Sequence, residues 1–397
     1  MIRLFINGLA ASAGGGLTYL RNVIPHLARR VDAQTTIWLN SAIRAEFGTL
    51  PNISFVETWE SSGVLRRFMR EQTALPKLIR QSGAQVLISA GNFALWNCPV
   101  PQILLSRNSL YTSEDFLRDV RDRRAYAIWA DTAVKGWLAR QSISRADVTV
   151  APSEAFAHEL SHWSGRKVLT VHHGFDAEAF TSNTAPLPPA VKTQLELGKD
   201  SLRLLFVSHY NYYRNFETLF RSLPILSDRL NGKKVKLFLT CRLSSDENPG
   251  SYRAEAASSL VSALRTSDSV VELGMIPYRS LHHLYRACNI YVTPAYAESF
   301  AHPLIESMSS GLPVVASDLP VHREICGDAG IYFDRFSPEA LAERVLQIHE
   351  SPELAARLSS CGLRRASDFS WSNHVGRMVT LAQELARSPA RSAGDRN

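Results

Sequence analysis

Residues 298–311 read ESFAHPLIESMSSG and carry the signals of a short helix. Proline is favoured in the first turn of a helix and glycine just past its end, so Pro303 and Gly311 predict a helix over 303–310. The spacing of the apolar residues gives this helix one face for burial. These residues are Leu304, Ile305 and Met308.

Two glutamates, Glu298 and Glu306, stand on either side of the predicted helix start, with seven residues between them. The first backbone N–H groups of a helix have no partner within the helix and form a ready anion site. The segment therefore predicts two carboxylates beside a site for a phosphate. The alternative is that both glutamates are ordinary cap and surface residues, and their spacing alone does not separate the two interpretations.

Short apolar runs that fit buried strands alternate with helical patterns along the chain. In the first half they lie at 3–7, 35–39, 53–57, 85–89, 102–106 and 147–152, and the stretch 168–180 is expected to begin with a strand and end in a polar turn. In the second half they lie at 202–208, 235–241, 270–273, 290–294, 313–317 and 331–334. This alternation predicts an α/β fold with parallel sheets covered on both faces. We expect two facing Rossmann-like domains with a central cleft, because ligands bind beyond the carboxyl ends of such strands.

A proline-rich stretch, SNTAPLPPA at 182–190, separates the two halves and lacks apolar periodicity, which is typical of a linker. The final residues, SPARSAGDRN, are typical of a disordered tail. The expected division is an N-terminal domain over 1–181, a linker over 182–200, a C-terminal domain over 201–371, a last helix over 372–387 and a tail over 388–397.

The composition limits the possible environments and partners. Lys and Arg total 44 against 37 Asp and Glu, a net charge of +7 that suits anionic partners or serves solubility alone. The five cysteines are too scattered for a disulfide framework or a metal knuckle, so we expect a cytoplasmic protein. No apolar run is long enough to span a membrane, and no nucleic-acid-binding motif is present.

Two basic stretches lie in the first half, at 64–80 and 115–140, and the second also contains Trp129 and Trp137. Basic helices with aromatic residues can lie on an anionic membrane surface. We therefore expect a peripheral membrane contact through the N-terminal domain, with an ordinary solvated helix face as the alternative.

Gly14, Gly15 and Gly16 follow the first predicted strand and precede a helical pattern over 17–30. Strand, glycine turn and helix together are typical of the opening unit of a nucleotide-binding domain. Neither the dinucleotide G-x-G-x-x-G pattern nor a P-loop is present, so a tight turn with close helix packing is an equal alternative.

The second half contains the segments VELGMIP, LHHLYRACNIYVTPAYAESF, ESMSSGLPVVASD and REICGDAGIYFD between residues 271 and 334, and FVSHYNYYRN at 206–215. Together these segments resemble the retaining glycosyltransferases of family four, which have the GT-B fold. Near the start, GGGLTYL is similar to the glycine loop of that family. Phe369-Ser370-Trp371 resembles the point where the family's last helix turns back onto the first domain.

The resemblance implies roles for the two glutamates and the residues around them. Glu306 is expected to bind the ribose hydroxyls of a nucleotide sugar, and Glu298 to orient the donor sugar and support positive charge at its anomeric carbon. Arg214 is expected to stabilise the leaving diphosphate. The amides of Phe300, Ala301 and His302 would meet the diphosphate, the backbone at Met275 and Ile276 would hold the base, and Gly15 and Gly16 would let the first domain approach the phosphates.

Some positions depart from the family pattern. His209 stands where an arginine usually completes the basic pair. Ala301 replaces a usual glycine, which we expect the loop to tolerate only with a negative φ. Arg107 and Asn108 stand where a histidine often lies near the acceptor, so the sequence predicts no general base.

The resemblance implies metal-independent transfer of a hexose from a nucleotide diphosphate sugar to a glycan or lipid-linked acceptor, with retention of configuration. No Asp-x-Asp occurs in the chain, so we expect no metal and no other cofactor. UDP-, GDP- and ADP-sugars all fit, and overall likeness favours GDP-mannose and a mannosyltransferase. The alternatives are an epimerase or phosphorylase on the same fold, or a non-catalytic module that binds sugar nucleotides or glycans.

Overall fold

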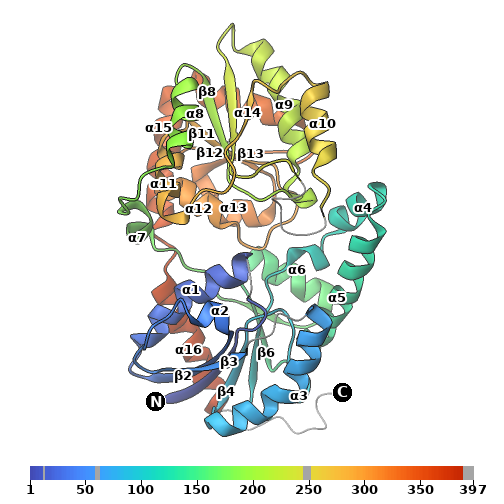
Figure 1. Ribbon diagram of the computed structural model, residues 1–397, viewed down its shortest axis with the longest axis vertical. Coiled ribbons are helices and arrows are strands. Elements are labelled where there is room, and N and C mark those ends of the chain that lie inside the picture. The colour runs from blue at the N-terminus through green and yellow to red at the C-terminus, as the bar shows by residue number, and fades with distance from the viewer. Residues whose placement is uncertain (12–13, 59–62, 245–251, 388–397) are drawn as a thin grey trace. The chain divides into compact units, whose positions relative to one another are not determined.

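The computed structural model describes residues 1–11, 14–58, 63–244 and 252–387 (Figure 1). Contacts group these residues into two units, each built on one parallel sheet flanked by helices, which confirms the predicted α/β fold class. Unit 1 contains residues 1–112, 130–174 and 370–387, and unit 2 contains 113–129 and 175–369. The predicted tail at 388–397 lies outside the described residues.

Unit 1 has a seven-stranded sheet in the order β3-β2-β1-β4-β5-β6-β7. Its strands are β1 (Ile2–Asn7), β2 (Ala33–Asn40), β3 (Ile53–Thr58), β4 (Val86–Ser89), β5 (Gln102–Leu105), β6 (Val148–Ala151) and β7 (Val168–Thr170). Its helices are α1 (Gly14–Ala28), α2 (Ser41–Arg44), α3 (Val64–Ser82), most of α5 (Tyr126–Arg145), α6 (Glu154–Ser164), α16 (Trp371–Arg387) and the 3-10 turn η1 (Ser109–Tyr111). All the strands lie where the apolar runs predict them.

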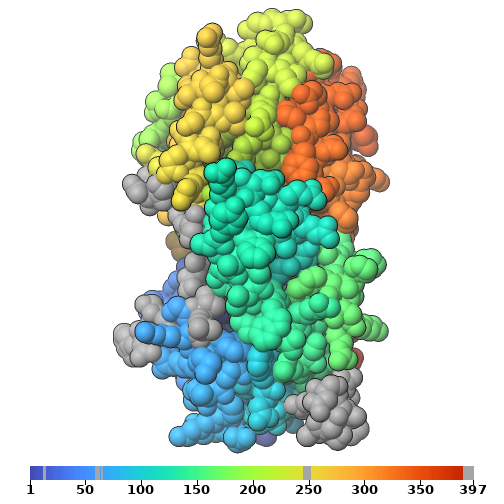
Figure 2. All heavy atoms as spheres, turned by 90° about the vertical axis from the view of Figure 1, so that its right-hand side faces the viewer, coloured from blue at the N-terminus to red at the C-terminus, as the bar shows by residue number. Residues whose placement is uncertain are grey.

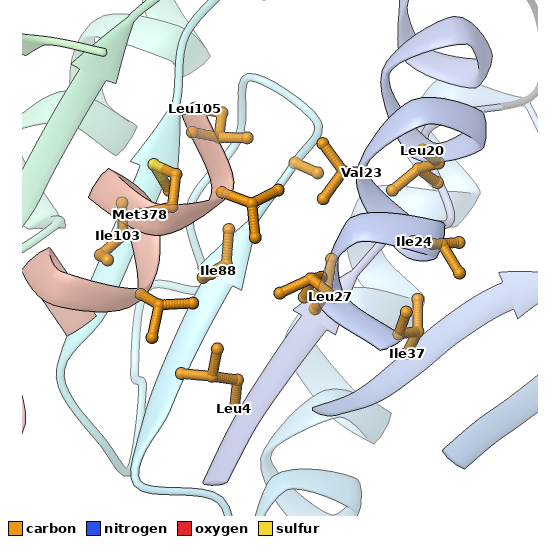
Figure 3. Close-up of a cluster of buried hydrophobic side chains, with 14 of the residues drawn as sticks. Leu4, Leu20, Val23, Ile24, Leu27, Ile37, Ile88, Ile103, Leu105 and Met378 are labelled. Atoms are coloured by element: carbon orange, nitrogen blue, oxygen red, sulfur yellow. The ribbon is translucent and has the colours of Figure 1, made fainter. Parts of the chain in front are cut away.

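The two faces of this sheet are covered by different helices. Leu4 and Ile6 of β1 pack with α1 and α16, whereas Phe5 between them points to the other face and packs with α3. Figure 3 shows Met378 of α16 beside Ile103 and Leu105 of β5, with α1 on the opposite side of the cluster. The last helix is therefore part of the core of unit 1.

Unit 2 has a six-stranded sheet in the order β10-β9-β8-β11-β12-β13. Its strands are β8 (Leu202–Phe206), β9 (Val235–Leu239), β10 (Val270–Glu272), β11 (Ile290–Thr293), β12 (Val314–Ser317) and β13 (Gly330–Phe333). Its helices are α4 (Glu114–Asp122), α7 (Ala177–Thr181), α8 (Pro189–Leu197), α9 (Phe216–Arg229), α10 (Glu255–Ala263), α11 (Tyr278–Arg286), α12 (His302–Ser309), α13 (Pro320–Cys326), α14 (Pro338–Glu350) and α15 (Pro352–Ala366), with the 3-10 turns η2 (Tyr212–Arg214) and η4 (Gly327–Ala329).

Two boundaries differ from the expected division. Residues 113–129, expected in the N-terminal domain, make their contacts in unit 2. The expected linker over 182–200 contains helix α8, and Val191 and Leu195 of this helix are buried. The basic stretch at 115–140 forms two helices, because Arg124 adopts a left-handed conformation with φ of 54° between α4 and α5.

Gly174 lies where the chain of unit 1 meets the start of α16. A Cβ atom at this position would lie 2.0 Å from the backbone nitrogen of Trp371 and 2.3 Å from its Cα, so only glycine fits without a backbone shift. We expect Gly174→Ala to lower the free energy of unfolding by about 3 kcal/mol in urea titrations. Gly48→Ala is the matched control, since nothing lies within 4 Å of its Cβ position. Equal stability of the two variants would contradict this packing.

Candidate active site

The strand order of the sheet in unit 2 creates a place where ligand binding is favoured. The chain runs outward from β8 to β9 and β10, then returns to place β11 on the other side of β8. Connections that leave two adjacent strands in opposite directions open a crevice at their carboxyl ends. The turn η2 follows β8, and the loop with Glu298 follows β11, so this crevice lies between them.

Helix α12 follows that loop and is confirmed within one residue of the predicted range. Pro303 lies in its first turn, and Gly311 follows its end with φ of 74°. The predicted apolar face is buried, because Leu304, Ile305 and Met308 are each no more than 1% exposed. The positive end of the helix dipole therefore lies beside the loop that carries Glu298.

Ala301 corrects one expectation. We expected a negative φ, but Ala301 precedes α12 with φ of 63° and ψ of 65°. This left-handed conformation costs a residue with a Cβ atom about 1–2 kcal/mol relative to glycine. The loop that carries Glu298 therefore contains local backbone strain at the start of the helix.

Arg214 and Glu298 form an ion pair, although 84 residues separate them in sequence. Their side chains are only 19% and 9% exposed. The two loops are also joined through the backbone, since the Tyr296 N–H donates to the Tyr213 carbonyl at 3.0 Å. Arg214 and the first glutamate of the predicted donor site are thus brought together.

Asn215 precedes α9 and has the residue type of a helix cap, but its side chain takes a different role. It has φ of 54°, and its Oδ1 accepts from the Thr218 hydroxyl at 3.0 Å rather than from a backbone N–H of the first turn of α9. Its Nδ2 donates instead to the carbonyl of Pro294 at 3.1 Å and to that of Arg335 at 2.6 Å. The residue after Arg214 is therefore fixed to the loops that follow β11 and β13. Ser280 likewise lies inside α11, and its hydroxyl donates to the carbonyl of Pro186 at 3.0 Å.

Glu306 lies inside α12 and is 6% exposed. The Tyr285 hydroxyl donates to its Oε2 at 2.8 Å, and Tyr278 supplies a second hydrogen bond. Burial raises the pKa of the Glu306 carboxyl to about 7, although the two tyrosines oppose the shift. The sequence pattern singled out Glu306 but gave no signal for its tyrosine partners.

Of the remaining predicted residues of unit 2, some are buried against neighbouring side chains and others are exposed. Phe300 is 2% exposed, and its ring packs against His302 at 4.8 Å and Phe369 at 5.7 Å. Met275 is 82% exposed and Ile276 8%, just beyond the carboxyl end of β10. Desolvation and the charge of Arg214 lower the pKa of His209, so this side chain is neutral at pH 7.

The tyrosines of the turn after β8 are explained by packing. Tyr210 is fully buried, and Tyr212 is 3% exposed. Their rings contact each other edge to face at 6.2 Å. Both rings therefore pack beneath the turn.

In unit 1, Gly15 and Gly16 lie in the first turn of α1 and not in a separate turn before it. Gly15 has open space at its Cβ position, whereas a Cβ at Gly16 would lie 3.2 Å from Ala11. Arg107 donates to the carbonyls of Gly15 and Ala90, which follow β1 and β4. These strands flank the point where the order of the first sheet reverses.

Asn108 accepts a hydrogen bond from the Leu110 N–H at 3.1 Å and so caps the turn η1. Beside Arg107, the Tyr19 ring lies 4.6 Å from the guanidinium carbon. The Tyr19 hydroxyl is 3.0 Å from Nε2 of His374, and Nδ1 of His374 is 2.8 Å from the His172 carbonyl. Burial lowers the pKa of His374 to about 4, so it is neutral and accepts from Tyr19. Sequence patterns gave no signal for this contact between α1 and α16.

His173 packs between the rings of Tyr19 and Trp371, at 5.3 and 5.5 Å. These contacts indicate a structural role for His173. No group of three His, Cys, Asp or Glu side chains that could hold a metal ion occurs in the described parts of the chain.

Comparison with known families covers most of the chain. The family described as Glycosyltransferase Family 4 matches residues 13–179, and that described as Glycosyl transferases group 1 matches residues 189–365. The chain belongs to glycosyltransferase family 4, with the GT-B fold. The predicted resemblance is thereby confirmed.

Curated relatives of this family 4 chain match over shorter stretches. O-antigen chain mannosyltransferase B from Escherichia coli is 36% identical over 101 residues, which cover 25% of this chain and 26% of that protein. D-inositol 3-phosphate glycosyltransferase from Thermobispora bispora is 26% identical over 250 residues, 62% of this chain and 57% of that protein. The matched region thus spans about a quarter to a little more than half of these relatives' lengths.

Solved structures match the fold over nearly the whole chain. Sucrose-phosphate synthase from Thermosynechococcus elongatus has a TM-score of 0.76 at 18% identity and covers 97% of this chain and 99% of that one. Anabaena HepE in complex with UDP-glucose has a TM-score of 0.71 at 15% identity, with coverage of 97% and 100%. At this identity the likeness shows the fold alone.

The strain at Ala301 gives a direct test of the loop conformation. Glycine adopts a φ of 63° without a Cβ clash, so we expect Ala301→Gly to raise the free energy of unfolding by about 1 kcal/mol. Urea titrations of the two proteins measure the difference. A loss of stability would mean that Ala301 has negative φ in solution, because glycine then only adds entropy to the unfolded chain.

Proposed function

We propose that this protein transfers a hexose from a nucleotide diphosphate sugar to a glycan or lipid-linked acceptor, with retention of configuration and without a metal ion. The observation that carries the proposal is the Arg214–Glu298 ion pair at the ligand-binding crevice of unit 2, next to the start of α12. Membership of family 4 supports the reaction class.

Each charged group of the crevice has a distinct role in this proposal. Arg214 and the N-terminus of α12 stabilise the negative charge of the leaving diphosphate. Because His209 is neutral at pH 7, Arg214 alone supplies the full positive charge. The diphosphate takes Arg214 from Glu298, which leaves the Glu298 carboxylate available to the donor sugar.

Glu306 binds the two ribose hydroxyls of the donor. A carboxylate accepts from both hydroxyls only when it is ionised. The acceptor hydroxyl attacks from the face that the diphosphate leaves, and the diphosphate takes the proton. This arrangement needs no general base from the protein.

The donor is the first point to test. HepE has been crystallised with UDP-glucose, and the Escherichia coli relative is named a mannosyltransferase, so uridine and guanosine nucleotides are the main candidates. A thermal-shift panel of UDP, GDP, ADP and TDP identifies the base, because a ligand that binds only the folded state raises the melting temperature. No shift with any of them would overturn the proposal.

Substitution of the two glutamates separates binding from transfer. We expect Glu306→Gln to weaken nucleotide binding by about tenfold at pH 8. Wild-type affinity should rise from pH 6 to pH 8, because the Glu306 pKa of about 7 leaves the carboxyl partly protonated at the lower pH. Glu306→Gln should lose this pH dependence. Calorimetric titration measures both effects.

Glu298→Ala is the companion variant. We expect it to abolish sugar transfer without weakening nucleotide binding, as followed by nucleoside diphosphate release in the presence of an acceptor panel. Transfer at the wild-type rate would contradict the role of Glu298.

Product analysis with the donor alone detects the epimerase alternative, and phosphate-dependent release detects a phosphorylase. Nucleotide binding without turnover over a wide acceptor panel would favour a non-catalytic module.

We also propose that unit 1 contacts an anionic membrane from the cytoplasmic side. Helices α3 and α5 share a buried cluster that contains Phe68 and Leu138. The outer side of both helices is open to solvent (Figure 2) and combines basic residues with large apolar ones. The membrane-facing residues are Arg66, Met69, Lys77, Arg80, Val134, Trp137 and Arg140.

The charge and the apolar character of this surface both fit a lipid headgroup layer. Met69, Val134 and Trp137 are each more than half exposed, which is costly in water but favourable at a bilayer interface. Each nearby basic residue adds about 1 kcal/mol of attraction to anionic lipid. No helix among residues 1–11, 14–58, 63–244 and 252–387 is long and apolar enough to cross a membrane.

Vesicle sedimentation tests this contact. We expect binding to phosphatidylglycerol vesicles but not to phosphatidylcholine vesicles, and Trp137→Ala should weaken it about tenfold. Leu363→Ala is the matched control, because Leu363 is 51% exposed in unit 2. Equal binding of both variants would contradict the assignment of this surface.

A further inference from the structure

Residues 113–129 leave the sheet of unit 1 between β5 and β6 and make their contacts in unit 2. We call this segment the arm. Its helix α4 is capped by Ser113, whose side chain accepts from the Phe116 N–H. Phe116 and Val120 are fully buried. The arm is therefore an integral part of unit 2 and not a surface loop.

Arg123 at the end of α4 contacts residues that lie before and after Arg214 in the sequence. Its guanidinium pairs with Asp119 at 2.7 Å and with Glu217 at 2.8 Å. It also lies 4.3 Å from the ring centre of Tyr212. Burial opposes its charge, but Glu217 and Asp119 together raise the pKa of Arg123, so it is a cation. Tyr212 precedes Arg214 by two residues, and Glu217 follows it by three.

The arm also holds the loop that carries Glu298. The Tyr296 hydroxyl donates to Oδ2 of Asp119 at 2.6 Å, and Tyr296 lies two residues before Glu298. On the remaining side, Arg335 donates twice to Oδ2 of Asp115, at 3.0 and 2.7 Å. The loops after β11 and β13 therefore hydrogen-bond to the arm, and the turn after β8 contacts it through the Tyr212 ring.

We propose that Arg123, with Asp119, is the positioning element of the donor site. The pair holds the Arg214 loop and the Glu298 loop in the geometry that accepts the diphosphate. This inference rests on the proposed function, because it assigns to Arg123 an effect on donor binding that acts through Arg214.

The physical reason is that Arg214 is useful only if its position is set before the ligand arrives. Ordering a cation on a mobile loop when the ligand binds reduces the binding free energy. A cation that is already held in position avoids this cost. The turn that carries Arg214 is only three residues long and has no sheet partner of its own. The aromatic contact of Phe116 with Tyr213, at 6.3 Å, completes its support from the arm.

The test uses the full chain and calorimetric titration with UDP, GDP and ADP. We expect Arg123→Ala to weaken binding of the preferred nucleotide about tenfold, and Tyr296→Phe about threefold. If Arg123 acts through Arg214, the double variant Arg123→Ala/Arg214→Ala binds no more weakly than Arg214→Ala alone. If Arg123 were merely structural, the losses of binding free energy in the two single variants would add in the double variant. Arg121→Ala is the matched control, because Arg121 is exposed on the same helix.

Thermal unfolding shows whether each variant is folded. If Arg123→Ala does not fold, Tyr296→Phe, which removes only one hydroxyl, tests the inference in its place. Wild-type affinity in Arg123→Ala and Tyr296→Phe would overturn this inference alone. Additive losses in the double variant would do the same. A wild-type protein that binds none of UDP, GDP, ADP and TDP would overturn the proposed function and this inference together.

Discussion

The ion pair between Arg214 and Glu298 is the interaction on which the candidate site depends. It exists because β8 and β11 are neighbours in the second sheet, although β9 and β10 separate them in the chain. The turn after one strand supplies the cation, and the loop after the other supplies the carboxylate. A parallel sheet with this order places both at the same edge, where a ligand can reach them.

The surroundings of the pair are built to hold it. Asn215 bonds to the loops after β11 and β13, and the backbone of Tyr213 accepts from Tyr296. Glu306 lies deeper in the same segment, with a pKa raised to about 7 by burial and two tyrosines as partners. In our account the diphosphate replaces Glu298 as the partner of Arg214, so donor binding itself releases the carboxylate that acts on the sugar.

Local features of the fold could be predicted from the sequence, and long-range ones could not. Apolar runs located the strands of both sheets, and Pro303 with Gly311 located α12 within one residue, because these signals depend on nearby residues only. The resemblance to family four singled out Glu298, Glu306 and Arg214 as candidate site residues. Their pairing was not predicted, since it depends on which strands are neighbours.

The corrections have physical causes of the same kind. Ala301 has a positive φ at the start of α12, so the folded structure there outweighs the local preference of a residue with a Cβ atom. Asn215 has the residue type of a helix cap, yet distant carbonyls take its side chain. The charged stretch at 115–140 suggested a solvated or membrane-bound face, but Asp115, Asp119 and Arg123 of its first helix are engaged inside unit 2.

The most direct measurement of the central claim is the affinity of Glu298→Gln for nucleoside diphosphates, titrated calorimetrically with UDP, GDP and ADP beside the wild type. If the diphosphate must displace Glu298 from Arg214, removal of the carboxylate charge frees Arg214 in advance. The account therefore predicts tighter binding of the preferred nucleotide, by about threefold or more, together with loss of sugar transfer. Unchanged or weaker binding would contradict it.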